Sequence, residues 1–284
     1  MADQIAAAHP LVIQDIEYLR HGEQGLLARL YRPEGSGPFP AIVEVHGGAW
    51  VNNDRLNNET AMRELAQSGI VVLSLDFRMP PDAGYPASAQ DINYAIRWLK
   101  ARAAAFGTEA GRVGGFGTSS GGQQILTAAL RPHDPRYSAI PGPAGVDASL
   151  AFVISAWGVV DPPARYALAR ARDNATMLDN HHRFWGDLAA MEEGSPPHIL
   201  ARGAAQAVPP ALIFQGGADD WTAPAQAEAL AAAWRAAGAE AEVAIYPGEK
   251  HGFMRDTPDT PAARAAITLV RDFIHRSGPG HGRA

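Results

Sequence analysis

The 284-residue sequence contains no cysteine, which excludes disulfide bonds, thiolate catalysis and cysteine-ligated metal sites. It also lacks an apolar run of membrane-spanning length, and it has no long run of charges of one sign. The N-terminal residues before Ile13 include no basic segment and are interrupted by His9-Pro10, so a signal peptide is not expected. Together with a net charge of −6, these absences predict a cytoplasmic protein that binds no nucleic acid.

The apolar residues that are present, 46% of the chain, suffice for the core of one α/β domain over residues 1–284. Apolar strand-like runs alternate with segments of helical periodicity. The predicted strands are residues 13–19, 26–31, 41–45, 70–75, 112–116, 151–157, 211–214 and 241–246. The predicted helices are residues 60–68, 88–103, 120–130, 225–237 and 261–276. This alternation predicts a mainly parallel central sheet with helices on both faces.

One short segment between a predicted strand and a predicted helix has the pattern Gly117-x-Ser119-x-Gly121. This context is typical of a nucleophile elbow, a tight strand-to-helix turn that exposes a serine hydroxyl. A side chain two residues before or after that serine would clash with backbone, which explains the glycines. Ser120 has Thr118 rather than glycine two residues earlier, so Ser119 is the predicted nucleophile. Taken alone, the pattern also fits an ordinary glycine- and serine-rich loop.

A second glycine-rich segment, His46-Gly47-Gly48-Ala49-Trp50, follows the predicted strand at residues 41–45. Glycines directly after a strand leave backbone N–H groups unobstructed by side chains, and a loop of this kind forms half of the oxyanion hole in esterases. The N–H of Ser120, at the start of a helix, is a further oxyanion donor. The alternative is a plain turn, which the presence of the elbow elsewhere in the sequence makes the weaker interpretation. His46 is expected to fix this loop.

An acid and a histidine follow the last two predicted strands. Asp219 and Asp220 come after the strand at residues 211–214, and His251 comes after the strand at residues 241–246. An acid at a strand end suits the group that orients a catalytic histidine, and a histidine on a late loop suits the general base. The order serine, aspartate, histidine is that of α/β-hydrolases. The Asp-x-Trp context favours Asp219 as the acid, and Asp220 remains the alternative.

Residues 161–193 interrupt the strand–helix alternation with a long, polar and aromatic segment that is predicted to form short helices. An insertion at this point would lie over the carboxyl ends of the strands, so it is predicted to be a cap or lid. The adjacent His181 and His182 suggest a metal site as an alternative, but no carboxylate–histidine spacing supports one, and no metal is predicted. Residues 278–284 are predicted to be a flexible tail.

Together these motifs resemble the α/β-hydrolase serine esterases of the hormone-sensitive-lipase and feruloyl-esterase-like type. The matching segments are His46-Gly47-Gly48-Ala49-Trp50, Asp76-Phe77-Arg78, Tyr85-Pro86, Asp91, Gly117-Thr118-Ser119-Ser120-Gly121-Gly122, Ser195-Pro196, Gly216-Gly217-Ala218-Asp219 and His251-Gly252-Phe253. The resemblance implies an α/β-hydrolase fold with a helical cap and a carboxylesterase without a cofactor. It also implies oxyanion donors at Gly48, Ala49 and Ser120, with Gly47 supporting the loop.

The chain departs from the family pattern in two places. Thr118 and Ser120 stand where the family has an acid and an alanine, and Val51-Asn52-Asn53-Asp54 stands where the family has a glycine. Neither departure removes a catalytic group, but both bear on which substrate is accepted. The nature of the substrate is therefore less defined than the reaction.

The expected reaction is hydrolysis of a small ester, with a short-chain acyl or an aryl group, through attack by Ser119 and proton removal by His251. The same triad acting on an amide, formamide or carbamate remains the alternative. A non-catalytic binding protein on this fold is a third interpretation, which the complete triad disfavours. The oligomeric state is open, with a homodimer as one option. The residues expected to line the substrate pocket are Trp50, Trp157, Trp221 and Phe253.

Overall fold

The centre of the molecule is one eight-stranded sheet with the strand order β1-β2-β4-β3-β5-β6-β7-β8. This computed structural model describes residues 8–277, so the predicted flexible tail at residues 278–284 lies outside the described residues. The strands are β1 (Leu11–His21), β2 (Gln24–Pro33), β3 (Phe39–Val45), β4 (Val71–Leu75), β5 (Thr108–Thr118), β6 (Val153–Ala156), β7 (Ala211–Gly216) and β8 (Ala241–Tyr246). The pairs β1–β2 and β2–β4 are antiparallel. The remaining neighbours in the sheet, in the order β4-β3-β5-β6-β7-β8, pair in parallel. The prediction of a mainly parallel sheet is confirmed.

The inner strands are apolar on both faces because successive side chains point to opposite sides of a sheet. On β3, Val43 belongs to one buried cluster and Ile42 to the other. On β7, Ile213 and Leu212 divide in the same way. A strand that is buried on both faces needs a continuous apolar run, and this run is the signal that identified these strands in the sequence.

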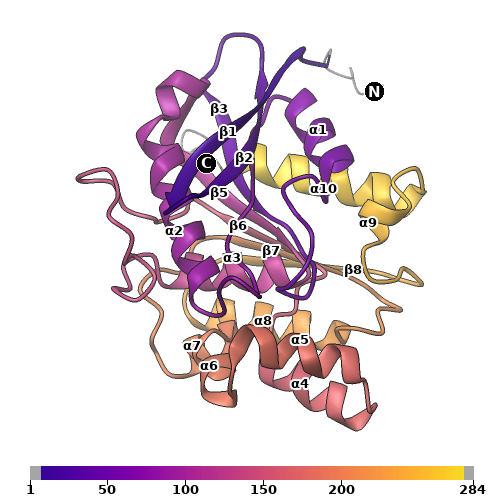
Figure 1. The fold of residues 1–284 in the computed structure, drawn as a ribbon. Helices are drawn as coiled ribbons and strands as arrows, with labels where there is room; N and C mark the ends of the chain where they lie inside the picture. Colours follow the sequence, from indigo (N-terminus) through magenta and orange to yellow (C-terminus); the bar gives the residue numbers. More distant parts are fainter. Residues whose placement is uncertain (1–7, 278–284) are drawn as a thin grey trace.

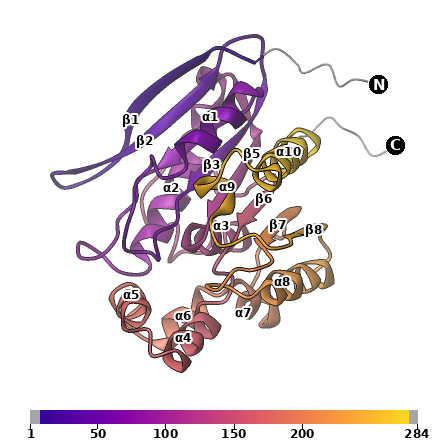
Figure 2. The ribbon, with the colours of Figure 1, turned by 90° about the vertical axis from the view of Figure 1, so that its right-hand side faces the viewer.

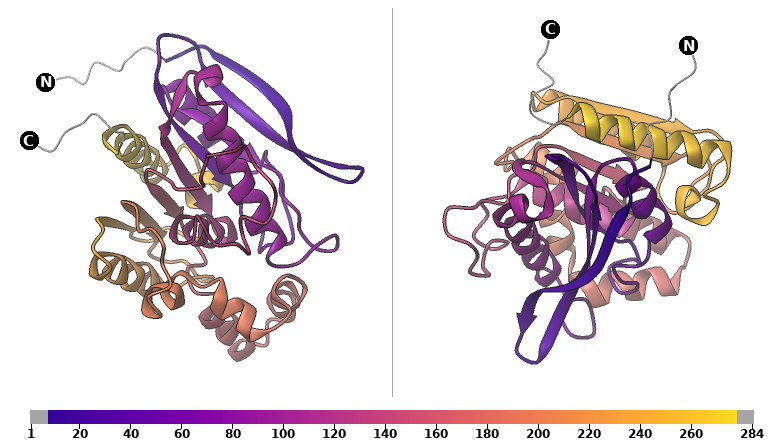
Figure 3. Two further views of the ribbon diagram at one scale, coloured as in Figure 1. Left: turned by 90° about the vertical axis from the view of Figure 1, so that its left-hand side faces the viewer. Right: turned by 90° about the horizontal axis from the view of Figure 1, so that it is seen from above.

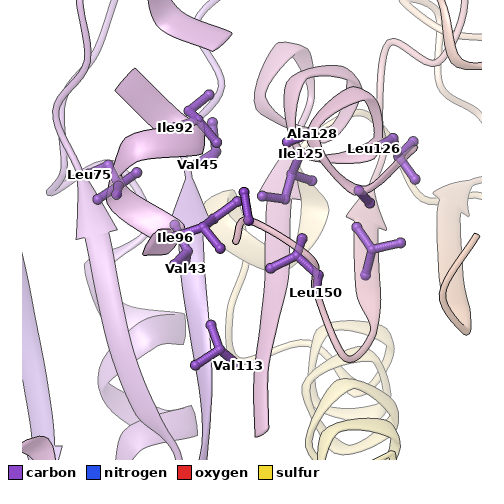
Figure 4. Close-up of a cluster of buried hydrophobic side chains, with 14 of the residues drawn as sticks. Val43, Val45, Leu75, Ile92, Ile96, Val113, Ile125, Leu126, Ala128 and Leu150 are labelled. Carbon is purple, nitrogen blue, oxygen red and sulfur yellow. The ribbon is translucent and has the colours of Figure 1, made fainter. Parts of the chain in front are cut away.

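Helices cover both faces of the sheet, as Figures 1 and 3 show. The helices on one face are α2 (Ala87–Ala101), α3 (Ser120–Leu130), α7 (Pro196–Ala201) and α8 (Pro224–Ala236). The helices on the other face are α1 (Glu59–Gln67), α9 (Phe253–Asp256) and α10 (Pro261–Arg276). Figure 4 shows part of the first face, where Val43 and Val113 of the sheet meet Ile96 of α2 and Ile125 of α3. This packing fixes α3, and with it the turn that precedes α3.

Three short elements were not predicted from the sequence. They are the 3₁₀ helix η1 (Ala103–Phe106) and the helices α7 and α9. Each has only four to six residues, which is too few to display an apolar period of 3.6 residues. None of the helices within residues 8–277 combines the length and the apolar character needed to cross a bilayer.

The segment predicted to be a cap, residues 161–193, forms three helices, in agreement with the short helices predicted there. They are α4 (Pro162–Ala171), α5 (Ala175–Trp185) and α6 (Leu188–Glu193). Each helix begins after an Asp or Asn whose side chain accepts a hydrogen bond from the backbone N–H three residues later: Asp161, Asn174 and Asp187. Such caps satisfy donors that a short helix would otherwise leave unpaired. Figures 1 and 2 show the three helices side by side at one end of the molecule.

A separate apolar cluster attaches these helices to the loop after β3. Trp50 of that loop stacks on Phe184 of α5, with ring centroids 5.7 Å apart, and meets Trp185 edge-on at 5.5 Å. Val159 and Met191 complete the contact. Burial of this much aromatic surface holds α5 and α6 against the sheet domain.

Candidate active site

Ser119 lies between the end of β5 and the first residue of α3, with a φ of 51° and a ψ of −119°. This backbone conformation is rare for a residue that has a side chain, and such strain is concentrated at functional turns. A Cβ atom on Gly117 would lie 2.3 Å from the Gly121 carbonyl oxygen, and one on Gly121 would lie 2.1 Å from the Val45 carbonyl oxygen. Only glycine fits at these two positions, because β3, β5 and α3 converge there.

His251, on the loop after β8, joins Ser119 to Asp219. Its Nε2 atom lies 2.9 Å from Ser119 Oγ, and its Nδ1 atom lies 2.8 Å from Asp219 Oδ2. An ionised carboxylate only accepts hydrogen bonds, so Nδ1 carries the proton and donates it to Asp219. Nε2 is then the acceptor for the Ser119 hydroxyl. In this tautomer His251 is ready to remove the proton of Ser119.

The carboxylate of Asp219 is held by the backbone N–H groups of Trp221 and Thr222, at 2.7 and 3.1 Å, and by the side chain of Gln215. Burial alone would raise the pKa of Asp219, but the hydrogen bond and charge of His251 and these N–H groups outweigh burial. The pKa therefore lies below its ordinary value, and Asp219 is an anion at neutral pH. An anion at this position stabilises a positively charged His251.

Asp220, the alternative acid, points elsewhere. Its side chain is exposed, and its backbone oxygen accepts a hydrogen bond from Arg172. Of the two adjacent aspartates, only Asp219 forms a hydrogen bond with His251. The loop after β7 therefore directs one carboxylate inward and the other toward solvent.

The loop after β3 lies against the elbow. Gly48 and Ala49 have φ angles of 121° and 53° and line the same cavity as Ser119. Across residues 8–277, the backbone N–H groups of Gly48, Ala49 and Ser120 have no hydrogen-bond acceptor. Gly47 does not line the cavity; a Cβ atom there would lie 3.0 Å from Ser119 Cβ. The loop thus brings unused donors close to a serine hydroxyl, which is the arrangement that an oxyanion requires.

Side chains hold this loop in place. Ser120 Oγ accepts a hydrogen bond from the backbone N–H of Trp50 at 3.1 Å, which gives a role to a serine where the family has alanine. The Trp50 indole N–H donates to Gln123 Oε1 at 2.9 Å. Burial lowers the pKa of His46, so its neutral ring donates from Nδ1 to the Gly47 carbonyl oxygen at 2.6 Å. His46 acts on the loop and not on the cavity.

A cavity of about 300 Å³ lies over Ser119 and His251. It is formed between the loops that follow the strands and the helices α4 and α5. The residues that line it are Gly48, Ala49, Asn52, Asn53, Ser119, Arg165, Asn174, Thr176, Met177, Asn180, Trp221, His251 and Arg255. Two of the thirteen are arginines and none is an acid, so the lining favours negatively charged groups.

Of the four aromatic residues expected to line the pocket, Trp221 does so. The expectation requires correction for Trp50, Trp157 and Phe253, which are buried in the interior and do not line this cavity. Trp50 is part of the cluster with α5 and α6, and Trp157 packs edge-on against Phe214 and Phe253 at 5.7 and 5.9 Å. The position of these residues in the sequence did not indicate which way their rings would turn.

The adjacent histidines of α5 have separate partners. His181 is buried and donates from Nδ1 to the Met177 carbonyl oxygen at 2.7 Å, whereas His182 Nε2 meets the hydroxyl of Tyr166 at 2.9 Å. In the described part of the chain, no three His, Asp or Glu side chains gather as metal ligands would.

Sequence reasoning missed the residues that α4 and α5 contribute to the cavity: Arg165, Thr176, Met177 and Asn180. Their contact with the cavity depends on how these helices are placed over the strand ends. No spacing within the segment records that placement, so the sequence carries no local signal for these residues.

Comparison with known proteins places the chain in a family. Residues 29–234 match the BD-FAE family. Esterase LipC from Mycobacterium tuberculosis is 30% identical over 251 residues, which cover 84% of this chain and 60% of LipC. Esterase LipQ from the same organism is 27% identical over 271 residues, which cover 92% of this chain and 61% of LipQ. The chain therefore spans about three-fifths of the length of these relatives.

A solved structure has a similar fold. The propionate-bound form of Est2, a thermophilic esterase from the planctomycete Thermogutta terrifontis, matches with a TM-score of 0.77 at 21% identity, over 96% of this chain and 97% of Est2. The predicted α/β-hydrolase architecture is confirmed by this likeness. Since the family match also extends over more than half of the residues, the chain belongs to the BD-FAE family of α/β-hydrolases.

Proposed function

We propose that this protein is a carboxylesterase in which Ser119 is the nucleophile, His251 the general base and Asp219 the acid that orients His251. The observation that carries the proposal is the continuous line of hydrogen bonds from Ser119 Oγ through His251 to Asp219. The names of the relatives LipC and LipQ, both esterases, supply the bond type. No cofactor takes part in this chemistry.

In the first half of the reaction, Ser119 Oγ attacks the ester carbonyl carbon while its proton passes to His251 Nε2. The negative charge that develops on the carbonyl oxygen is stabilised by the N–H groups of Gly48, Ala49 and Ser120, and one such donor is typically worth about 3 kcal/mol. The bond to the alcohol then breaks, and His251 returns the proton to the leaving oxygen. In the second half, His251 activates water, which releases the acid from Ser119.

The cavity has two sides, which we name by their residues. The floor consists of Gly48, Ala49, Ser119 and His251, which lie on loops that follow strands. The roof consists of Arg165, Asn174, Thr176, Met177 and Asn180, which belong to α4, α5 and the turn between them. In the proposed function α4 to α6 act as a cap, and a cavity of about 300 Å³ accepts a small ester with a short acyl or an aryl group.

The test is hydrolysis of p-nitrophenyl esters from acetate to decanoate. The expected result is turnover that peaks at short chains and falls about 10⁴-fold or more in Ser119→Ala, because the nucleophile is lost. The matched control is Ser36→Ala, the same substitution at an exposed position between β2 and β3 that does not line the cavity. That variant is expected to retain most of its activity.

The assignment of Ser119 is wrong if Ser119→Ala keeps most of its turnover. If wild type cleaves no ester but a fluorophosphonate still labels Ser119, the triad acts on a different bond. Matched p-nitroanilides and carbamates would then be the substrates to test, since the same steps cleave them.

A further inference from the structure

Arg165 of α4 is a cation inside the cavity that the protein itself does not neutralise. The residue is 5% exposed and lines the cavity together with Ser119 and His251. Its Nε and Nη1 atoms are buried without a partner, and no hydrogen bond or ion pair reaches its guanidinium from elsewhere in residues 8–277. A buried charge without a partner is costly, so a group at this position requires an explanation.

The surroundings of Arg165 explain only part of its burial. The guanidinium carbon lies 5.5 Å from the ring centre of Trp50 and 5.9 Å from that of Trp221. Aromatic faces attract a cation, but they do not replace the acceptors that the N–H groups of a guanidinium need. The neighbouring His181 is neutral, because burial and the charge of Arg165 lower its pKa to about 4.

The carboxylate whose charge acts on Arg165 is Asp219, but this carboxylate is already engaged by His251, Trp221 and Thr222. Burial lowers the pKa of Arg165 to about 10, which leaves it positively charged at neutral pH. By contrast, Arg255 lines the same cavity and forms an ion pair with Asp256. The free positive charge of the cavity is therefore concentrated at Arg165.

We infer that Arg165 binds a carboxylate of the substrate, so that the preferred substrates are esters that carry a free carboxylate, such as half-esters of dicarboxylic acids. The inference rests on the proposed function. A carboxylate matches one guanidinium in charge and in planar geometry. A phosphate dianion would retain a second charge, which the uncharged asparagines of the cavity do not neutralise. One end of such a substrate lies at Ser119 and the other at the roof.

The test compares mono(p-nitrophenyl) adipate with its neutral methyl ester, which has the same chain and the same leaving group. Wild type is expected to show about tenfold or higher kcat/KM for the anionic substrate at neutral pH. Arg165→Met keeps an unbranched side chain of similar length but removes the charge. It is expected to lower kcat/KM for the anionic substrate about 10- to 100-fold and to change that for the methyl ester less than about threefold.

The matched control is Arg170→Met, the same substitution on an exposed position of the same helix. It is expected to leave both substrates unaffected. Arg165→Lys retains the charge without the fork geometry, so it is expected to recover part of the preference. An equal loss on both substrates in Arg165→Met, or a similar loss in Arg170→Met, would overturn the inference.

A second measurement does not depend on the variant or on turnover. We expect wild type to bind adipate, as measured by calorimetry. We also expect adipate to inhibit hydrolysis of the methyl ester competitively. If Arg165→Met does not fold, a wild type that prefers the methyl ester and does not bind adipate overturns the inference. If wild type hydrolyses neither ester, the proposed function fails, and adipate binding still decides whether Arg165 holds a carboxylate.

Discussion

The floor and the roof of the cavity are built in different ways. The floor depends on backbone conformation: Ser119 and Ala49 have positive φ angles, which place the Ser119 hydroxyl and the N–H groups of the loop after β3 beside one another at strand ends. The roof uses side chains on short helices, with Arg165 and Met177 as its buried members. The floor is anchored in the hydrogen-bonded sheet, whereas the roof is held by helix caps and the aromatic cluster around Trp50.

In the proposed function, this difference separates the reaction from the choice of substrate. The floor would meet the reacting atoms, which all esters share. The side chains of the roof would meet the remainder of the substrate, which differs from one ester to the next. We therefore expect changes in the floor to lower turnover for all esters alike, and changes in the roof to alter the preference among them.

The largest effect is expected for Asp219→Asn, which acts on the floor because Asp219 accepts a hydrogen bond from His251. Loss of the carboxylate removes the charge that stabilises a protonated His251 and favours the wrong tautomer. The expected effect is a fall of about 10³- to 10⁴-fold in kcat/KM, by the same factor for p-nitrophenyl acetate and butyrate. The control is Asp220→Asn, expected to stay within about twofold of wild type. A larger loss in Asp220→Asn than in Asp219→Asn would reverse the assignment.

A smaller effect is expected beneath the floor, at Glu44 of β3. Glu44 is fully buried, and Asn58 Nδ2 donates to its Oε1 at 2.7 Å and to Thr118 Oγ1 of the elbow strand at 3.1 Å. Burial raises the pKa of Glu44 to about 7, although the hydrogen bond from Asn58 opposes the shift. Between about pH 4.5 and pH 7, the folded protein therefore holds a proton on Glu44 that the unfolded chain has already released.

Stability should fall as the pH rises through that interval and remain lower above it. Glu44→Gln removes this titration, so at pH 8 the variant is expected to be more stable than wild type by on the order of 2 kcal/mol. Urea unfolding of both proteins at pH 5 and pH 8 measures the difference. If the variant is less stable than wild type at pH 8, the buried carboxylate is stabilising in its ionised form.

The smallest effect is expected for Met177→Ala in the roof. Shortening this side chain enlarges the cavity, so kcat/KM for p-nitrophenyl hexanoate is expected to rise about tenfold relative to acetate. The control is Met191→Ala, because Met191 is buried in the cluster around Trp50 but does not line the cavity. Both substitutions lower stability, but only Met177→Ala should change the chain-length preference. A similar change in both variants would show that the roof responds as a whole.

The same division decides what could be predicted from the sequence. The elbow, the loop after β3 and the order of Ser119, Asp219 and His251 were recognisable because each follows an apolar strand and needs fixed residue types nearby. The ends of α3, β8 and α10 also agree with the prediction. These signals are local, because an apolar strand run, a glycine or a helix cap determines the conformation of residues that are close to it in the sequence.

The roof was recognisable only as a set of short helices. Arg165 has no sequence pattern around it that distinguishes an unpaired buried arginine from a solvated one. Trp50 and Trp157 were expected in the pocket, but their rings pack into clusters formed by distant segments. Side-chain direction at such positions is set by tertiary packing, which one sequence does not display.

Trp221 has a consequence that is optical rather than chemical. It is 45% exposed in the cavity wall, with its ring centre 6.3 Å from that of His251. The other five tryptophans are at most 5% exposed. A water-soluble quencher therefore reaches one indole, so the fluorescence that it removes reports whether the cavity is open or filled. Trp221 is therefore an intrinsic fluorescent reporter of the cavity. A thiol-reactive dye could not serve this purpose, because the sequence contains no cysteine.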